Sequence, residues 1–456
     1  MSKPIVALVG RPNVGKSTLF NRLVGERMAI VDDTPGTTRD RLFGEAEWNG
    51  RAFHVVDTGG IDPTHGGKTP LSIGSADFID EIRAQAKVAV DEADVVLFVN
   101  DGETGVTAPD LEVATILRRS QKKLRDGSFF PPIFVVVNKA ESKERWDNAP
   151  QFYELGLGDP HPVSAVHGTG TGDLLDVIVA AFPEEEAVEE DDSIKIAIVG
   201  KPNAGKSSLL NKLVGEERAI VSPIPGTTRD ATDTKIDVNG LPVTLIDTAG
   251  IRRRGKIEPG VEQFSVLRSF KAIERADVAL LMIDATTGIT SQDAHIAGFI
   301  LDQWKSCVVI VNKWDAVAKD SFTMEEYTRK IRADLNFMDY VPLLFISAKT
   351  GQRVDQVLPM ALRVQEERLA RLTTSKINEV IHKAQDAHAH PSHAGRTLKM
   401  FYGTQVRSDP PTFMIYVNDP KLMHFTYLRY LENQIREEYG FLGTPIRIVT
   451  KGRREK

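Results

Sequence analysis

Short apolar runs alternate with stretches of helical spacing along most of the chain. The first run, PIVALVG, ends at Gly10 in the pattern of a buried strand, and the segment from Lys16 to Val24 then has the spacing of a helix. Four further runs are typical of buried strands: ADVVLFVND, PIFVVVNK, ADVALLMIDA and CVVIVNK. Strands that alternate with helices predict an α/β fold whose mainly parallel sheets carry helices on both faces.

Two segments alternate between apolar and polar residues on either side of an Asn-Gly pair. They are EAEWNGRAFHVVD, around Asn49-Gly50, and DTKIDVNGLPVTLID, around Asn239-Gly240. Asn-Gly between alternating stretches is a strong signal for a β-hairpin with a two-residue turn. Each parallel sheet is therefore expected to gain one antiparallel strand.

The chain contains the same set of motifs twice. GRPNVGKSTLF begins at Gly10 and returns as GKPNAGKSSLL at Gly200, and PGTTRD and DTGG return at the same offset as PGTTRD and DTAG. The separation between NKAE at Asn138 and NKWD at Asn312 is smaller than the offset of the other pairs. The first copy therefore has more residues between DTGG and NKAE than the second has between DTAG and NKWD. We expect much of the excess in the Gly- and Pro-rich run IDPTHGGKTPLSIGS. Repeats of this length predict two duplicated domains.

Length and composition are typical of a soluble protein with several domains. The 456 residues suggest about three domains, and 41% apolar with 26% charged residues suits several packed cores. No apolar run approaches the ~20 residues of a membrane span, and MSKPIVALVG is too short in its apolar part for a signal peptide. The single Cys307 excludes an internal disulfide. Together these features predict a cytoplasmic protein.

Charge is distributed unevenly along the chain. PEEEAVEEDD, at Pro183–Asp192, has seven acidic residues in ten, which predicts a self-repelling, extended linker between the two copies. The net charge is −6, but the residues from Arg371 onward include 14 Lys or Arg against 8 Asp or Glu. This excess of positive charge favours a polyanionic partner for the last third of the chain, although a solvated basic surface would give the same count.

Both glycine-rich turns match G-x-x-x-x-G-K-[ST] between a predicted strand and a predicted helix, which is the context of a phosphate-binding loop. Glycine lets backbone N–H groups close around phosphate oxygens, and the helix N-terminus adds a partial positive charge. The lysine of each loop would reach the β- and γ-phosphates, and the serine after it would bind Mg²⁺. The expected loop residues are Gly10, Arg11, Pro12, Asn13, Val14, Gly15, Lys16, Ser17 and Thr18, and Gly200, Lys201, Pro202, Asn203, Ala204, Gly205, Lys206, Ser207 and Ser208.

DTGG and DTAG each end a predicted strand, where the aspartate can lie close to Mg²⁺ and the last glycine can offer its N–H to a γ-phosphate. PGTTRD supplies a threonine that closes on the metal when the third phosphate is present. The expected residues are Thr38, Asp57, Thr58, Gly59, Gly60 and Ile61, and Thr228, Asp247, Thr248, Ala249, Gly250 and Ile251. The expected Mg²⁺ ligands are Ser17, Thr38 and Asp57, and Ser207, Thr228 and Asp247.

NKWD predicts that the bound base is guanine. The Asp315 carboxylate can accept two N–H bonds from guanine N1 and N2, which adenine cannot donate; Asn312 would contact the base and Lys313 would cover it. NKAE ends in Glu141, which is one methylene longer, so GTP is expected at both sites while guanine selectivity at the first stays open. VSAVHG and ISAKTG would offer N–H groups to the guanine oxygen. The expected residues are Asn138, Lys139, Ala140, Glu141, Ser164 and Ala165, and Asn312, Lys313, Trp314, Asp315, Ser347 and Ala348.

In this order the phosphate loop, TTRD, DTxG, NKxD and SAxxG resemble the motifs of translation-factor-like small GTPases. Two such domains with a C-terminal extension resemble the Der family, also called EngA, of bacterial ribosome assembly, over essentially the whole chain. The resemblance implies two tandem P-loop GTPase (Ras-like) domains at 1–182 and 193–366, joined by the linker at 183–192, and an α+β KH-like domain at 367–456. It also implies a monomer that hydrolyses GTP and acts, through a nucleotide-driven switch, on the large (50S) ribosomal subunit and its rRNA.

The residues of the third domain allow the implied fold. Thr373–Ala389 has helical spacing, LKMFYGTQV and PTFMIYV resemble paired strands, Pro420–Tyr439 predicts a helix, and TPIRIVTK predicts a last strand. GFLG at Gly440–Gly443 matches the GXXG loop of RNA-binding KH domains. It lies between a helix and the last strand rather than between two helices, so we expect RNA contacts over the basic surface instead.

Ras-like enzymes orient the attacking water with a glutamine at the position of Ile61 and Ile251, so a low intrinsic rate is expected, roughly the 10⁻⁴–10⁻³ s⁻¹ of unassisted Ras. Relatives with asparagine in the phosphate loop can bind K⁺ there, which implies K⁺-stimulated hydrolysis. Arg252–Arg254 could supply the positive charge instead, but we favour their interpretation as a basic switch segment that contacts RNA or the third domain. The expected catalytic residues are Asn13, Lys16, Thr38 and Gly60, and Asn203, Lys206, Thr228 and Gly250, with K⁺ at Asn13 and Asn203.

The alternative function is that of a GTPase coupled to tRNA modification. Members of that class also carry TTRD loops and K⁺ sites, but they have one GTPase domain inside a helical domain and a reactive cysteine near the C-terminus. This chain has two such motif sets and no cysteine after Cys307. A metabolic P-loop ATPase or kinase is disfavoured by NKWD.

Overall fold

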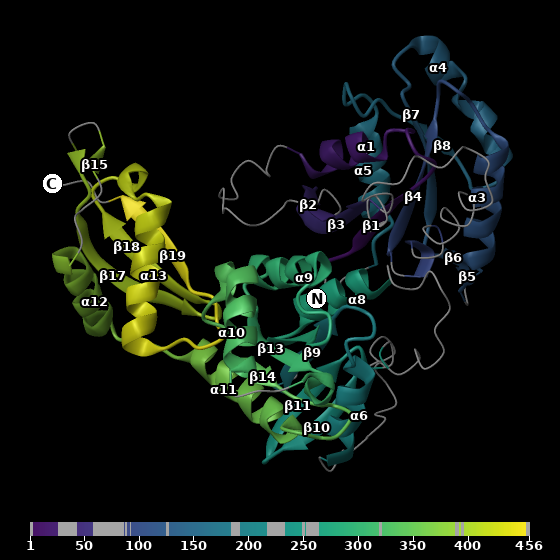
Figure 1. Cartoon of the computed structure of the whole chain (residues 1–456). Helices are drawn as coiled ribbons and strands as arrows, with labels where there is room; N and C mark the ends of the chain where they lie inside the picture. Colours follow the sequence, from purple (N-terminus) through teal and green to yellow (C-terminus); the bar gives the residue numbers. More distant parts are fainter. Residues whose placement is uncertain are drawn as a thin grey trace. The chain divides into compact units, whose positions relative to one another are not determined.

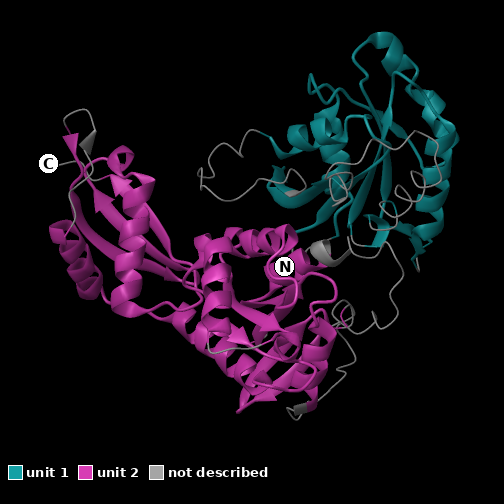
Figure 2. Ribbon diagram, in the orientation of Figure 1, with its two compact units in different colours: residues 1–189, 258–267 teal, residues 190–257, 268–456 magenta. Residues whose placement is uncertain are grey.

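The computed structural model describes residues 3–25, 43–57, 86, 89–91, 93–124, 127–183, 192–216, 233–248, 251, 264–318, 322–387, 392–393 and 396–452. The chain forms two compact units, residues 1–189 with 258–267 and residues 190–257 with 268–456 (Figure 2). Of the predicted acidic linker, only Pro183 and Asp192 fall among the described residues. No helix in the described part of the chain has the length and apolarity needed to cross a membrane.

The first copy of the repeat folds around a six-stranded sheet (Figure 1). Its elements are β1 (Ile5–Val9), α1 (Lys16–Val24), β2 (Phe43–Trp48), β3 (Arg51–Asp57), β4 (Val95–Asp101), α3 (Ala108–Ser120), β5 (Lys122–Lys123), β6 (Phe129–Phe130), β7 (Ile133–Asn138), α4 (Lys143–Asp147), the 3₁₀ helix η4 (Ala149–Leu155), β8 (Pro160–Pro162) and α5 (Thr171–Ala180). The strand order is β2-β3-β1-β4-β7-β8, and only β2 is antiparallel to its neighbour.

Strand β1 shows why this sheet is covered on both faces. All five of its residues are buried, and alternate side chains enter two different apolar clusters: Ile5, Ala7 and Val9 join one, and Val6 and Leu8 join the other. Residues of α3 belong to the first cluster, and residues of α1 and α5 belong to the second. The predicted α/β fold with helices on both faces is confirmed.

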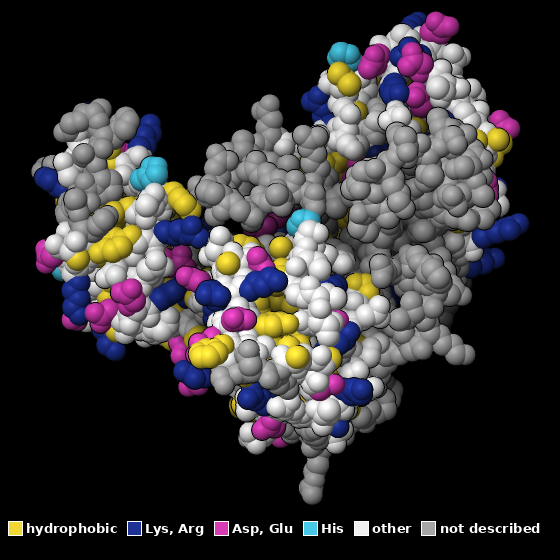
Figure 3. Space-filling model, viewed as in Figure 1, with side chains coloured by type: hydrophobic (Ala, Val, Ile, Leu, Met, Phe, Trp, Pro, Cys, Tyr) yellow, Lys and Arg dark blue, Asp and Glu magenta, His cyan; other side chains and the backbone are white. Residues whose placement is uncertain are grey.

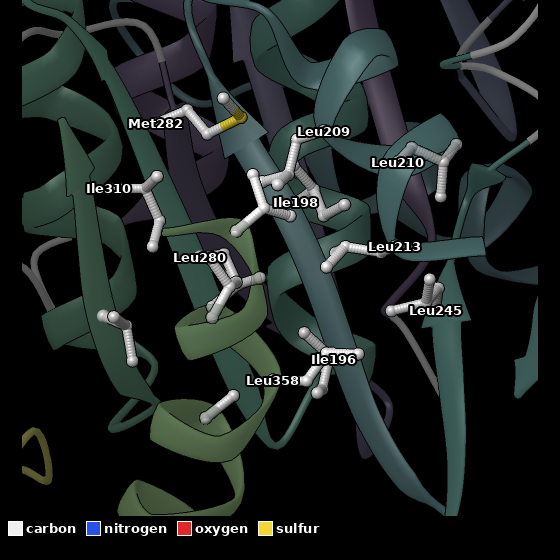
Figure 4. Packing of buried hydrophobic residues seen from close by; sticks show 14 of the residues in the cluster. Ile196, Ile198, Leu209, Leu210, Leu213, Leu245, Leu280, Met282, Ile310 and Leu358 are labelled. Atoms are coloured by element: carbon white, nitrogen blue, oxygen red, sulfur yellow. The ribbon is translucent and has the colours of Figure 1, made fainter. Parts of the chain in front are cut away.

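The second copy repeats this architecture with the order β10-β11-β9-β12-β13-β14. Its elements are β9 (Ile194–Gly200), α6 (Lys206–Glu216), β10 (Thr234–Val238), β11 (Leu241–Ile246), α8 (Phe264–Arg275), β12 (Val278–Asp284), α9 (Ser291–Asp302), β13 (Ser306–Asn312), η6 (Trp314–Ala316), α10 (Thr323–Asp334), η7 (Asn336–Met338), β14 (Leu343–Phe345), η8 (Val354–Gln356) and α11 (Val357–Leu369). In Figure 4, Ile198 of β9, Leu209 of α6, Leu280 of β12 and Leu358 of α11 belong to one apolar cluster between the sheet and its helices.

Both predicted hairpins are present. β2 pairs antiparallel with β3, and β10 pairs antiparallel with β11. Asn49 and Gly50 have φ of 49° and 77°, and Asn239 and Gly240 have φ of 53° and 84°. Positive φ at both central residues is the conformation that the right-handed twist of the strands favours and that Asn-Gly adopts readily.

The run IDPTHGGKTPLSIGS, in which we expected much of the excess, lies outside the described residues. The stretch from Asp57 to Asp101 that contains it accounts for the smaller part of the excess. Asp101 and Asp284 end the equivalent strands β4 and β12, and Asn138 and Asn312 end the equivalent strands β7 and β13. The stretch from Asp101 to Asn138 is longer than the stretch from Asp284 to Asn312, and this difference accounts for more than half of the excess. Here β5 and β6 form an added hairpin. Such a hairpin needs few residues and no periodic apolar pattern, so it gave no signal in the sequence.

The residues after α11 form a three-stranded sheet with two helices. Its elements are α12 (Thr374–Ala387), β15 (Ser392–His393), β16 (Arg396–Thr397), β17 (Met400–Ser408), β18 (Pro411–Val417), η9 (Pro420–Leu422), α13 (Phe425–Tyr439) and β19 (Arg447–Gly452). β17 pairs antiparallel with β18, and β19 adds parallel to β18, so the α+β arrangement is confirmed.

The helix predicted over Pro420–Tyr439 begins later than expected. Asp419 accepts the Lys421 N–H at 3.0 Å and caps only the short η9. His424 is extended, with ψ of 147°, and its ring nitrogen accepts the Thr426 N–H, so the α-helix starts at the next residue. Local capping by these polar side chains competes with a continuous helix.

The turn between α13 and β19 docks on the second parallel sheet. Cys307 at the start of β13 donates its N–H to the Gly443 carbonyl at 2.8 Å, and the Gly443 N–H donates to the Tyr340 carbonyl at 3.0 Å. The hydroxyls of Ser306 and Thr444, both buried, lie 2.9 Å apart. GFLG therefore supplies main-chain contacts within the protein at this position.

Arg368 of α11 makes a second connection between the same two sheets. Its side chain is 4% exposed, donates from Nε to the Asp409 carboxylate at 2.6 Å, and donates from Nη1 to the Trp304 carbonyl at 2.7 Å. Asp409 belongs to the turn between β17 and β18. The β17-β18-β19 sheet is thus attached to the sheet of the second copy at two separate points.

We predict that Arg368→Ala loosens this attachment. Hydrogen bonds to charged groups contribute about 1.5–3 kcal/mol each, so protection of the Cys307 and Gly443 amides against hydrogen exchange should fall by roughly ten- to 150-fold. Arg363→Ala is the matched control, because Arg363 is exposed on the same helix. Equal protection in the two variants would contradict the role given to Arg368.

Candidate functional site

Each glycine-rich turn joins the first strand of its sheet to the following helix and wraps around its own lysine. Lys16 Nζ donates to the carbonyls of Gly10 at 2.7 Å and Arg11 at 2.8 Å. Lys206 makes the same two contacts in the second copy, both at 2.6 Å. The turn therefore holds an ammonium group at the point where the helix N-terminus already favours an anion.

Asn138 and Asn312 tie each phosphate loop to the loop after the last strand of the sheet. Asn138 donates from Nδ2 to the Val14 carbonyl at 2.9 Å and accepts the Ala165 N–H on Oδ1 at 3.0 Å. Asn312 repeats both bonds, at 2.8 and 2.9 Å. The Ala165 and Ala348 N–H groups, which we expected at a guanine oxygen, thus donate to asparagine in this structure.

This tie gives the second glycine of each loop a steric role that the sequence did not indicate. Gly15 and Gly205 have φ of 90° and 101°. A Cβ at either position would overlap Nδ2 of Asn138 or Asn312. The missing side chain therefore makes room for the asparagine amide as well as allowing the left-handed backbone.

The lysine of each NKxD motif is held by a carboxylate that the sequence analysis missed. Lys139 Nζ lies 2.7 Å from Asp101, and Lys313 Nζ lies 2.6 Å from Asp284. Burial raises the pKa of Asp101, but hydrogen bonds from Lys139 and from backbone N–H groups outweigh it, so the pKa lies below its ordinary value of 3.8. The pKa of Asp284 is lowered in the same way, against burial, by Lys313 and a threonine. Both aspartates are therefore ionised at neutral pH and fix the lysine that precedes the base-reading residues.

The two base-reading loops differ in how firmly they are anchored. In the second copy Trp314 is buried with its ring edge-on to Tyr327, and the exposed Asp315 accepts a hydrogen bond from Ser347 Oγ at 2.6 Å. In the first copy Glu141 is exposed, and among the described residues no hydrogen bond or ion pair of its side chain occurs. The carboxylate of the second site is thus held in place and that of the first is not.

Oxygen groups suited to Mg²⁺ lie together in the first copy. Ser17 Oγ donates to the Asp57 carboxylate at 2.8 Å, and Asp57 is 3% exposed. A hydroxyl and a carboxylate at this separation are the hard oxygen ligands that Mg²⁺ prefers, so these residues fit the ion. In the second copy Ser207 Oγ instead donates to the Ile251 carbonyl at 2.8 Å.

Several predicted residues lie outside the described part of the chain. These are the residues expected to respond to the third phosphate, and they comprise Thr38, Thr58, Gly59, Gly60 and Ile61 in the first copy and Thr228, Ala249 and Gly250 in the second. Arg252–Arg254 lie outside it as well.

A second pair of carboxylates holds the start of each phosphate loop. Arg11 Nε donates to Asp110 at 2.7 Å, and Asp110 also accepts the N–H and hydroxyl of Thr107 at the start of α3. In the second copy Lys201 Nζ lies 3.6 Å from Asp293. The repeated T-x-x-D sequences TAPD and TSQD, which form capping boxes, are the signal that could have identified these residues.

Comparison with known proteins places these features in a family. A family model described as "50S ribosome-binding GTPase" matches residues 5–139 and again 195–313, and one described as "KH-domain-like of EngA bacterial GTPase enzymes, C-terminal" matches 371–451. The "GTPase Der" of Herpetosiphon aurantiacus is 54% identical over 100% of this chain and 98% of its own length. The chain belongs to the GTPase Der family.

Two other Der proteins agree with this assignment over the full chain. The "GTPase Der" of Geobacillus thermodenitrificans is 50% identical over 100% of both chains, and that of Chloroflexus aggregans is 51% identical over 100% of this chain and 99% of its own. The chain is therefore a GTPase with two tandem P-loop GTPase domains and a C-terminal KH-like domain.

We predict that Gly205→Ala removes nucleotide binding at the second site. The new methyl would displace Asn312 and impose a strained backbone, at a cost on the order of 1–3 kcal/mol or more. Calorimetric titration of the full chain with GDP should fall from two equivalents to one. Gly298→Ala is the control, because a Cβ at Gly298 meets no atom within 4 Å; two equivalents with unchanged affinity in Gly205→Ala would refute the prediction.

Proposed function

We propose that this GTPase is an assembly factor for the large (50S) ribosomal subunit, in which a nucleotide-driven switch controls binding to rRNA. The observation that supports this most directly is the match of both GTPase domains to a family described as "50S ribosome-binding GTPase", in a chain that also carries a KH-like domain. The basic excess from Arg371 onward is consistent with a polyanionic partner. We further propose that it acts as a cytoplasmic monomer, with domains at 1–182, 193–366 and 367–456.

We propose that GTP occupies both phosphate loops. The backbone N–H groups of each loop would hold the β- and γ-phosphates, and Lys16 and Lys206 would exchange their carbonyl partners for phosphate oxygens. Asp315, already oriented by Ser347, would accept the N–H groups of guanine at the second site. Glu141 would do so at the first site, where its extra methylene and the lack of a side-chain partner among the described residues predict weaker selection of guanine.

Mg²⁺ would be held by Ser17 and Asp57, and by Ser207 and Asp247, with Thr38 and Thr228 completing the sites when GTP is bound. Bound there, the ion would neutralise charge on the β- and γ-phosphates. At the second site Ile251 is 8% exposed and lies in the apolar core, so its side chain cannot orient an attacking water. Charge on the phosphates would then be neutralised by the loop lysines and the Gly60 or Gly250 N–H groups together with the bound cations.

We propose that Asn13 and Asn203 bind K⁺ against the phosphates. Both asparagines are exposed in the loop and adopt left-handed φ of 66° and 61°, which turns this part of the loop into a sharp bend. Hydrolysis of GTP should therefore be at least about tenfold faster in KCl than in NaCl at equal ionic strength. Asn13→Ala/Asn203→Ala should remove the difference, and equal rates of the natural chain in both salts would disprove the K⁺ site.

The 50S role predicts nucleotide-dependent co-sedimentation with large subunits. Sedimentation of the full chain with purified 50S and 30S subunits should show retention on 50S that differs by about five- to 150-fold between GDP and a non-hydrolysable GTP analogue, the usual range of coupling between two ligands. The 30S subunit is the control. Equal retention on both subunits, or none on either, would refute the proposed function.

A further inference from the structure

The first GTPase domain has a segment that the duplicated fold does not require. In the second copy α9 ends at Asp302 and β13 begins at Ser306, whereas in the first copy α3 ends at Ser120 and β7 begins at Ile133. The intervening residues include β5 and β6, an antiparallel pair in which Lys122 faces Phe130 and Lys123 faces Phe129. The hairpin is an addition to one copy, so neither the sheet nor the nucleotide site explains it.

The hairpin and the end of α3 present a dense positive charge. Arg118, Arg119, Lys122 and Lys123 are all exposed, and the sequence of residues 113–139 contains a single acidic residue, Asp126. Within the part of the chain that the structure describes, none of the four forms an ion pair. Figure 3 shows Lys and Arg side chains at the β5 end of this edge of the first unit, with Asp and Glu side chains farther along it. This positive surface lies in a chain with a net charge of −6, so it is not a general property of the protein surface.

Large apolar side chains are exposed among these cations. Phe129 is 53% exposed and Leu124 is 46% exposed. Phe129 lies opposite Lys123 across the hairpin, so a ring and an ammonium group are presented side by side. Exposing a phenyl ring on a two-residue strand contributes nothing to the core of the domain.

The hairpin is fixed by hydrogen bonds at its base and next to its turn. Gln121 Nε2 donates to the Pro131 carbonyl at 2.7 Å, and the Leu124 N–H donates to the Ser128 carbonyl at 2.8 Å. These bonds set the direction of the two strands while leaving their side chains in solvent. The backbone that carries the cations and the ring therefore has a fixed conformation.

We propose that Arg118, Arg119, Lys122, Lys123 and Phe129 form an RNA-binding surface of the first GTPase domain that extends over both faces of the hairpin. In it the cations contact phosphates, and the phenyl ring, on the same face as Lys123, stacks on an unpaired base. Positive charge next to an exposed aromatic ring is the combination that recognises unpaired RNA, because it neutralises the backbone and covers a base. The proposal rests on the proposed ribosomal function, which makes RNA the polyanion at hand. An acidic membrane surface would also attract the cations and could receive the ring, so the test below includes lipid vesicles as a separate arm.

The test measures binding of the full chain to a fluorescein-labelled mixed-sequence oligoribonucleotide by anisotropy over a range of KCl concentrations. Lys122→Ala/Lys123→Ala should reduce the slope of log affinity against log salt by about 1.4, which is two phosphates at ~0.7 each. Phe129→Ser should lower affinity by about five- to 150-fold without changing the slope, and Phe129→Tyr should restore it. Arg329→Ala/Lys330→Ala, which removes two exposed cations from the second copy, should leave both quantities unchanged.

The possible outcomes distinguish a failure of the proposed RNA-binding surface from a failure of the proposed ribosomal function. The proposal is supported if the hairpin variants lose oligoribonucleotide binding and 50S retention in parallel while their GTP turnover is unchanged. Natural and hairpin-variant chains that bind the oligoribonucleotide and 50S equally overturn the surface and leave the ribosomal role intact. Failure of the natural chain to bind 50S refutes the ribosomal role itself. Hairpin-dependent binding to phosphatidylserine vesicles with unaltered RNA binding overturns the proposal in favour of a membrane contact.

Discussion

The hydrogen bonds of the Asn138 and Asn312 side chains are the constraint on which both nucleotide sites depend. One amide group joins a carbonyl of the phosphate loop to an N–H of the loop after the last strand, and it does so inside a buried volume where an unmade bond is costly. The bond has room only because Gly15 and Gly205 lack a Cβ. The phosphate-binding and base-reading parts are thereby set at a fixed separation before any ligand arrives.

The two copies share these asparagine hydrogen bonds but differ in the contacts of the nearby carboxylates and hydroxyls. In the second copy a buried Trp314 and a hydrogen bond from Ser347 hold the base-reading carboxylate, whereas Glu141 in the first extends into solvent. In the first copy the serine and aspartate proposed for Mg²⁺ already contact each other. The two copies therefore differ in which of the proposed ligand-binding residues are held in place by other side chains.

The KH-like domain is attached to the strands that lead to the loops of NKWD and ISAKTG. Gly443 bonds to Cys307 at the start of β13 and to Tyr340 just before β14, and the opposite ends of these strands lead to Asp315 and Ser347. β13 is bonded to a strand on each side, whereas β14 is the edge strand of the sheet. The third domain is thus attached at one end of the strands whose other ends carry Asn312 and lead to Ala348.

The sequence by itself determined the duplication, the two α/β domains, the Asn-Gly hairpins and the phosphate loops, because each rests on interactions between neighbours along the chain. The helix start at Phe425 was misplaced because capping by His424 competes locally with a pattern that favours helix. Only the tertiary structure could pair Lys139 with Asp101 and Arg11 with Asp110, since those partners lie far apart in the sequence. It also revealed that GFLG docks on β13 and that the added hairpin exposes Phe129, because burial and exposure are decided by what packs against a residue and not by its neighbours in sequence.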